Sequence, residues 1–239
     1  MSKHLKRRRA PKFWRVPRKE KTWVVSPRPG PHKKFESIPL LILIRDILKL
    51  VDTGKDAKKI IKAKEIFVDG KARNDHKYPV GLFDVVEIPK LGKQYRVVPT
   101  HKGLDIVEIQ KKEAKLKICR INDKTMIRDG VLQLNLHDGK NILIKKEKKT
   151  KDVYKTGDSL SVEIPRQKII EHIKMEKGSS AVLIGGQNIG ELVKIKDVIK
   201  TKSREPNKVI CQTKEKEFEA IKDYIFVVGK TKPVIKLSD

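Results

Sequence analysis

The fold is decided between Ser37 and Pro89, and the central part of this stretch, residues 53–73, reads TGKDAKKIIKAKEIFVDGKAR. Before it, Leu40 to Val51 is apolar on almost every side. This pattern predicts a buried helix that is too short to span a bilayer. Thr53 lies three residues before Asp56, the spacing at which two side chains satisfy the free amides of a helix start. A second helix is therefore predicted to begin here.

The second helix separates apolar from cationic residues. At about 100° per residue, Ala57, Ile60 and Ile61 fall on one side, and the lysines fall roughly 150° away. A run of lysines is usually a solvated helix face. Residues 53–73, however, hold seven Lys/Arg and three Asp/Glu, and the cations gather on one face. This arrangement favours contact with a polyanion, and the four lysines concerned are Lys55, Lys58, Lys59 and Lys62.

A hairpin follows the second helix. Residues 66–68 are apolar, Asp69-Gly70 is a two-residue turn that tolerates positive φ, and residues 71–73 form the return strand. Lys71 and Arg73 flank the turn, and a third apolar strand, Val85 to Ile88, completes a small sheet. The sequence thus predicts an α+β domain over residues 37–101.

The charge balance limits the classes of partner. The chain of 239 residues has 57 Lys+Arg against 30 Asp+Glu, a net charge of +27 and a pI near 10. Such an excess implies a polyanion, either nucleic acid or an anionic membrane surface. Because no amphipathic helix with an aromatic face, long apolar span or signal-peptide pattern is present in the sequence, we expect nucleic acid and no membrane.

The cysteines and histidines predict no metal site. Cys119 and Cys211 lie far apart in apolar, strand-like surroundings, which is typical of reduced, buried thiols in a cytosolic protein. No zinc-ligand spacing is present in the sequence. We therefore expect neither a metal nor a cofactor.

The first 36 residues form a basic extension with thirteen Lys/Arg, two Glu and five of the twelve prolines. A segment with this net charge of +11 is not expected to become ordered alone. Phe13, Trp14 and Trp23 interrupt the basic run, and two interpretations remain open: they stack on unpaired bases, or they attach the extension to the core. The cations expected to meet phosphates are Lys6, Arg7, Arg8, Arg9, Lys12, Arg15 and Arg18.

Residues 102–168 alternate short apolar runs with turns, which predicts a central β-domain. A charge-rich connection, residues 145–151, is expected to be a solvated loop, or a phosphate clamp if RNA lies beside it. The predicted strands are Leu104–Ile109, Leu116–Ile121, Val131–Leu136, Ile142–Ile144 and Leu160–Ile164.

The last segment, residues 169–239, contains a glycine-rich turn between two apolar runs. Its glycine spacing does not match a dinucleotide fingerprint, and a strand follows it, so no helix dipole would face a phosphate. The arrangement resembles a KOW motif, a small barrel element of ribosomal proteins and transcription elongation factors. The resemblance implies an SH3-like barrel. The turn residues expected to contact RNA or protein are Gly185, Gly186, Gln187, Asn188 and Gly190.

The helix pair and hairpin resemble the S4-like RNA-binding domain, which a bacterial ribosomal protein shares with several RNA-modifying enzymes. One departure concerns the end of the module: Gly81-Leu82-Phe83-Asp84 stands where that family usually has Asp directly after Gly. The matching residues are Lys55, Ala57, Lys58, Ile61, Val68, Asp69-Gly70-Lys71 and Val80-Gly81.

The whole chain resembles the archaeal and eukaryotic S4e family of small-subunit ribosomal proteins. The resemblance implies a structural role on the cytoplasmic ribosome, contacts with 16S-type ribosomal RNA and neighbouring ribosomal proteins, and no homo-oligomer. Beyond the residues given above, His32 and Lys64 are also expected to contact RNA. The stretches that carry the resemblance are His4-Leu5-Lys6-Arg7, Pro27-Arg28-Pro29, Gly30-Pro31-His32, Asp69-Gly70-Lys71, Tyr78-Pro79, Gly185-Gly186 with Gly190, and Ile225-Phe226-Val227-Val228-Gly229-Lys230.

Two other functions remain as alternatives. An RNA-modifying enzyme would need a catalytic domain, but the six histidines are scattered and no pair of carboxylates has an acid-base spacing. No enzyme is therefore expected. A non-ribosomal translation or transcription factor is the other alternative, suggested by the KOW-like turn. The fold expected overall is an α+β RNA-binding domain followed by mainly β domains, the last an SH3-like barrel.

Overall fold

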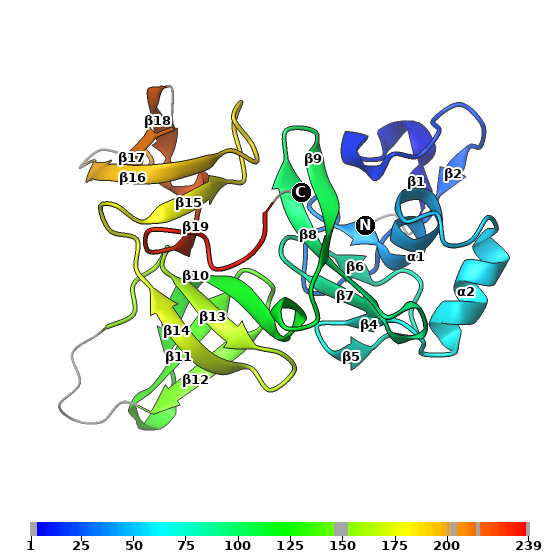
Figure 1. Cartoon of the computed structure of the whole chain (residues 1–239), viewed down its shortest axis with the longest axis horizontal. Helices are drawn as coiled ribbons and strands as arrows, with labels where there is room; N and C mark the ends of the chain where they lie inside the picture. The colour runs from blue at the N-terminus through cyan, green and yellow to red at the C-terminus, as the bar shows by residue number, and fades with distance from the viewer. Residues whose placement is uncertain (1–3, 146–152, 200, 202–204, 214–215, 238–239) are drawn as a thin grey trace. The chain divides into compact units, whose positions relative to one another are not determined.

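The chain forms two compact units (Figure 1). The computed structural model describes residues 4–145, 153–199, 201, 205–213 and 216–237. Unit 1 comprises Met1–Val97 and Lys102–Lys115, and unit 2 comprises Val98–His101 and Leu116–Asp239. No helix among the described residues is long and apolar enough to cross a membrane.

Unit 1 is built on a five-stranded antiparallel sheet in the order β5-β4-β7-β8-β9. The predicted hairpin is confirmed: Val68 pairs with Lys71, and the turn residues Asp69 and Gly70 have φ of 51° and 69°. β9 had been predicted to belong to the central β-domain, but it extends this sheet instead. The strands are β4 Phe67–Val68, β5 Lys71–Ala72, β7 Val85–Ile88, β8 Lys93–Thr100 and β9 Gly103–Ile109.

Two helices accompany this sheet. α1, Leu40–Ile42, continues as a π-helical turn over Leu43–Ile47, and Leu40 to Ile44 are buried, as predicted for a core helix. The helix ends earlier than predicted, because Lys49 takes a φ of +51° that an α-helix cannot accommodate. α2 spans Gly54–Lys62 and begins at its predicted N-cap, Thr53.

The N-terminal extension packs against the core of unit 1. β1, Leu5–Lys6, pairs with β2, Trp23–Val24, and β3, Ile38–Pro39, pairs with β6, Pro79–Val80. Trp14 is 0% exposed and donates its indole N–H to the Ser37 carbonyl at 2.8 Å. This differs from the predicted unordered segment, because several apolar residues of the extension, Leu5, Trp14 and Val16 among them, are spaced so that they enter one core.

Unit 2 contains two five-stranded antiparallel sheets, which confirms that the chain is mainly β after its first helices. The first has the order β12-β11-β10-β13-β14 and the second has the order β18-β17-β16-β15-β19. The first sheet consists of β10 Leu116–Met126, β11 Val131–Leu136, β12 Asn141–Lys145, β13 Ser159–Glu163 and β14 Lys168–Ile173. The second consists of β15 Ser180–Leu183, β16 Leu192–Ile199, β17 Lys208–Gln212, β18 Glu217–Ile221 and β19 Ile225–Gly229.

Each sheet of unit 2 covers its own apolar cluster. Cys119, Ile121 and Leu160 lie in the cluster of the first sheet, and Cys211 and Val227 lie in that of the second. Both cysteines are free and buried. Short 3₁₀ turns occupy Arg7–Arg9, Lys12–Trp14, Pro89–Leu91, Glu113–Lys115, Arg128–Gly130 and Lys222–Tyr224.

Candidate nucleic-acid interface

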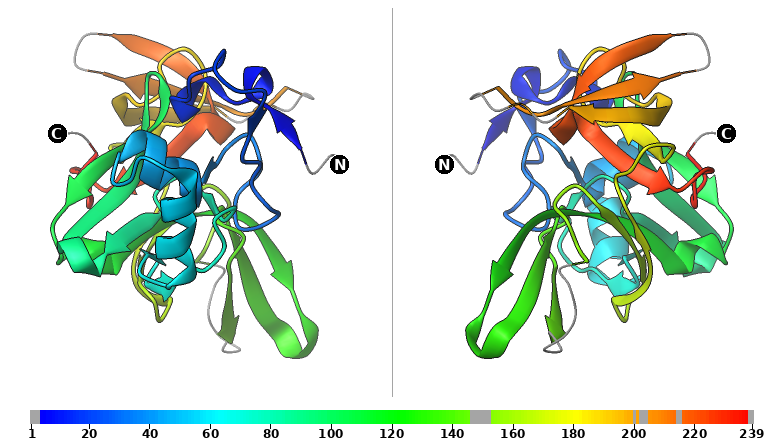
Figure 2. Two further views of the ribbon diagram at one scale, coloured as in Figure 1. Left: turned by 90° about the vertical axis from the view of Figure 1, so that its right-hand side faces the viewer. Right: turned by 90° about the vertical axis from the view of Figure 1, so that its left-hand side faces the viewer.

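α2 presents a cationic face whose direction is fixed by its apolar face. Ala57 and Ile61 are fully buried in the core of unit 1. The Thr53 hydroxyl accepts the Asp56 backbone N–H at 3.2 Å and donates to the Asp56 carboxylate at 2.6 Å, so the cap is reciprocal. Figure 2 shows α2 running along the front of unit 1 in the left view. The four predicted lysines are all exposed: Lys55, Lys58, Lys59 and Lys62.

These lysines are almost free of acidic partners. Lys59 lies 4.0 Å from the Asp56 carboxylate, and both groups are largely exposed. Within the described part of the chain, no carboxylate lies within 4.0 Å of Lys55, Lys58 or Lys62. Their charge is therefore available to an outside anion, which is the property that phosphate contact requires.

The hairpin adds two cations of different kinds. Lys71 is exposed on β5 next to the Asp69-Gly70 turn. Arg73 lies over the Tyr78 ring, with its guanidinium carbon 4.2 Å from the ring centroid. Stacking of this kind fixes the plane of a guanidinium, so the Arg73 side chain is held in one orientation, whereas Lys71 has a flexible stem. Lys64 is exposed just after α2, with a φ of 59°.

A second group of cations, which the sequence did not single out, gathers around Asp75. Its carboxylate lies 3.2 Å from Arg28 Nη1 and accepts the Lys77 backbone N–H at 2.9 Å. Burial, and then the nearby Lys58 ammonium, lower the pKa of His76; Lys77 and Arg28 add to this effect and Asp75 opposes it. Three cations, Lys58, Lys77 and Arg28, thus act on His76 next to α2. The sequence signal would have been Arg28 between two prolines, which limits its backbone.

In the extension, some of the predicted site residues are buried or paired within the protein, and others are exposed. Trp14 is buried in the core, so of the two open interpretations it attaches the extension and does not stack on bases. Arg7 is only 5% exposed; it donates to the Pro17 carbonyl at 2.6 Å and lies 3.6 Å from Glu20. Arg15 is paired with Asp105, and Arg18 donates to backbone carbonyls. The exposed predicted cations are Lys6, Arg8, Arg9, Lys12 and Arg15.

His32 is a structural residue in this fold. Its Nε2 lies 3.0 Å from the Asp84 carboxylate, which also accepts the Gly81 backbone N–H at 2.9 Å. A Cβ on Gly81 would lie 2.2 Å from the His32 ring, so only glycine fits there. Phe83, one of the two extra residues between Gly81 and Asp84, takes a φ of 59° and is buried. The His32 side chain is 5% exposed, and its expected contact with RNA stays a prediction.

The glycine-rich turn between β15 and β16 is shaped by close packing. A Cβ on Gly185 would lie 2.6 Å from the Tyr224 ring, and one on Gly190 would lie 2.7 Å from the Thr100 backbone. Gly186 and Gln187 are exposed, and Asn188 is half-buried. Two of the predicted contact residues are therefore required by the fold itself. The expected clamp in the charge-rich connection lies mostly outside the described residues.

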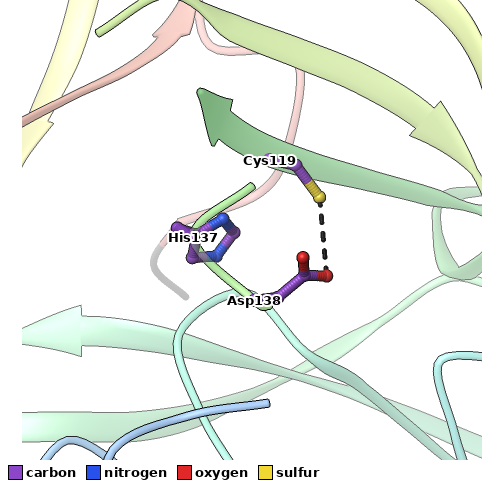
Figure 3. Close-up of side chains that lie close together, drawn as sticks. All are labelled: Cys119, His137 and Asp138. Carbon is purple, nitrogen blue, oxygen red and sulfur yellow. Dashed lines mark hydrogen bonds between the residues drawn. The ribbon is translucent and has the colours of Figure 1, made fainter. Parts of the chain in front are cut away.

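Cys119, His137 and Asp138 bring three ligand-type atoms within 4.8 Å of one another (Figure 3). Asp138 is already bound by two ammonium groups, Lys117 Nζ at 2.9 Å and Lys140 Nζ at 3.1 Å. The His137 Nδ1 accepts the backbone N–H of Arg120 at 3.2 Å. The cluster is thus a buried ion-pair network, in which two ammonium groups already neutralise the Asp138 carboxylate.

Burial by itself would raise the pKa of Asp138, but the Lys117 ammonium, with His137 and Lys140, outweighs burial and holds the pKa far below its usual range. Lys117 and Asp138 are 1% and 0% exposed at their side chains. These charges therefore serve the stability of unit 2, in contrast to the exposed lysines of α2.

A β-rich fold with an unneutralised cationic helix face defines a basic protein built to bind a polyanion. Two family models match the chain: Ribosomal family S4e over residues 91–169 and the RS4NT (NUC023) domain over residues 1–35. The small ribosomal subunit protein eS4 of Archaeoglobus fulgidus is 48% identical over 237 residues, covering 98% of this chain and 97% of that protein. The eS4 protein of Methanothermobacter thermautotrophicus is 44% identical over 237 residues, covering 98% and 96%.

A solved structure agrees with these relatives. The crystal structure of the 30S ribosomal protein S4e from Thermoplasma acidophilum has a TM-score of 0.69 and 32% identity, covering 82% of this chain and 96% of that one. The chain belongs to the S4e family of ribosomal proteins. Because this is a family of structural ribosomal proteins, the chain is not an enzyme.

Proposed function

We propose that this chain is a structural constituent of the small ribosomal subunit in the cytoplasm, where it binds 16S-type ribosomal RNA. The observation that carries the proposal is the face of α2, where Lys55, Lys58 and Lys62 lack acidic partners among the described residues. Lys71 and Arg73 extend this face from the hairpin. Such cations position a protein through phosphates, and recognition then depends on the shape of the RNA more than on base edges.

In this proposal the chain consists of three modules after its N-terminal extension. Residues 37–101 form the S4-like RNA-binding module, with β9 added to its sheet, and residues 102–168 supply most of the central β-domain. Residues 169–239 form a KOW-type, SH3-like barrel. The support for the last assignment is the tight glycine turn between β15 and β16 and the five-stranded order of the sheet. Neighbouring ribosomal proteins are the expected protein partners, and no homo-oligomer is expected.

Crosslinking in cells, followed by sequencing of the RNA bound to the full chain, tests this function. The expected result is a dominant footprint on small-subunit ribosomal RNA. Enrichment on transfer RNA or on messenger RNA would contradict the proposal and favour a translation or transcription factor. A gradient in high salt gives a second readout, since a subunit constituent stays with the small subunit and a transient factor is released.

A further inference from the structure

The two tryptophans of the chain have opposite environments. Trp14 is 0% exposed, whereas Trp23 is 55% exposed. The register of the β1–β2 ribbon explains the difference: Leu5 pairs with Val24 on the face that enters the core, and Lys6 pairs with Trp23 on the outer face. In the sequence both tryptophans were candidates for base stacking, and the structure leaves Trp23 exposed for it.

The surroundings of Trp23 specify the chemistry of a ligand. The His4 ring lies 5.7 Å away at an interplanar angle of 57°, so it does not stack on the indole, which remains more than half open. Lys6 is the cross-strand neighbour of Trp23, and Lys21 and Arg8 are also exposed in this segment. Glu20, the acidic residue nearest to Trp23 in the sequence, lies beside Arg7. A ligand must therefore bring a flat π-surface and negative charge together.

An unpaired nucleotide has both properties, since its base stacks on aromatic rings and its phosphate attracts lysine. We propose that Trp23 is a stacking platform for an unpaired base of RNA, and that Lys6 contacts the adjoining phosphate. This inference rests on the proposed function and adds a contact to single-stranded RNA, which α2 does not supply. Base stacking of this kind changes affinity by about 5-fold to 150-fold when the ring is replaced by alanine.

The test uses the full chain with two probes, a short single-stranded oligonucleotide and an abasic oligonucleotide of equal length and charge. Trp23→Ala is expected to weaken binding of the first probe by about fivefold or more, and Trp23→Phe should keep most of the affinity. The abasic probe should bind both proteins equally. Trp23→Ala should leave the salt dependence unchanged, because stacking releases no counterions.

Fluorescence gives an independent readout. The oligonucleotide should quench the emission of wild-type protein, and Trp23→Phe, which keeps only the buried Trp14, should show no such quenching. Equal binding of the single-stranded oligonucleotide by Trp23→Ala and wild-type protein would overturn the stacking site. The proposed function would still stand if variants of α2 bound ribosomal RNA more weakly than wild type. If the Trp23→Ala protein no longer bound small subunits but still bound the oligonucleotide like wild type, the Trp23 ring would contact a neighbouring protein. That result would also overturn the stacking site.

Discussion

Exposed lysines are present both on α2 and on the C-terminal sheet, but the two groups differ in their acidic partners. In the second sheet of unit 2, Lys196 lies 2.7 Å from Glu217, and Lys208 lies 3.4 Å from Glu219. Lys177 lies 3.0 Å from Asp197 nearby. On α2 the nearest such pair is 4.0 Å long. Lysine content alone therefore does not distinguish the two surfaces, whereas their acidic partners do.

The charge of the two units shows the same difference. Unit 1 carries thirty Lys/Arg and thirteen Asp/Glu, a net charge of +17, and unit 2 carries twenty-seven and seventeen, a net charge of +10. Exposed ion pairs add at most about 1 kcal/mol each to stability. In unit 2 the ion pairs mainly neutralise the surface charge around them. Unit 1 therefore attracts a polyanion more strongly than unit 2.

The largest effect is expected where a charge pair is buried. Asp138→Asn leaves the Lys117 ammonium without its main counter-charge and should lower the free energy of unfolding by about 3–5 kcal/mol. Denaturant unfolding of the full chain measures this. The matched control is Lys58→Ala on α2, which should stay within about 0.5 kcal/mol of wild type. A loss below about 1 kcal/mol for Asp138→Asn would contradict the assignment of this pair to stability.

The same pair predicts a dependence on acid. The folded pKa of Asp138 lies below its unfolded value near 4, so its stabilising effect is complete above about pH 5 and declines as the pH falls towards the folded pKa. Asp138→Asn should lack this part of the acid loss. Denaturant unfolding of wild type and Asp138→Asn at pH 7 and at pH 3 measures this difference. An equal decrease in the free energy of unfolding in the two proteins would contradict the prediction.

A smaller effect is expected at the start of α2. Thr53→Ala removes the oxygen that accepts the Asp56 N–H and should cost about 1 kcal/mol, while Thr53→Ser should keep the cap. Amide exchange should show faster opening of the first turn, which carries Lys55. RNA affinity should fall slightly, because the cationic face is then less well ordered. An unchanged exchange rate at Asp56 would show that the cap does not hold this turn.

The smallest effect is expected on the C-terminal sheet. Glu217→Gln with Glu219→Gln removes the partners of Lys196 and Lys208 without adding a cation. Stability should change by less than about 1 kcal/mol per pair, and non-specific RNA affinity should rise a few-fold at low salt. Filter binding at low and moderate salt measures this gain. No gain at all would mean that ion pairing is not what keeps this sheet from RNA.

Local patterns predicted the centre of unit 1 well. The cap at Thr53, the two faces of α2 and the turn at Asp69-Gly70 depend on neighbours in sequence, and the structure has all of them. The fate of Trp14 depends instead on the Ser37 carbonyl, 23 residues away, and that of His32 on Asp84, 52 residues away. The net charge of the extension gave no indication of these contacts, because burying a few well-spaced apolar residues stabilises the extension more than its solvated cations destabilise it.

For the same reason the domain limits were harder to predict than the strands. The strand predicted over Leu104–Ile109 is present as Gly103–Ile109, but its alternation gives no information about which sheet it joins. Pairing with β8 decides this, and it moves the strand from the central β-domain to unit 1. The acidic partners of the C-terminal lysines were likewise invisible, since the register of β16 to β18 brings them together.

The most direct test of the account is the salt dependence of binding to small-subunit ribosomal RNA. Two triple variants each lower the net charge by the same amount: Lys55→Gln, Lys58→Gln and Lys62→Gln on α2, and Lys177→Gln, Lys196→Gln and Lys208→Gln in unit 2. The α2 variant should reduce the slope of log K against log salt by about two to three, and the unit 2 variant by less than about one. Equal slopes for the two variants would contradict the claim that unpaired charge on α2 forms the interface.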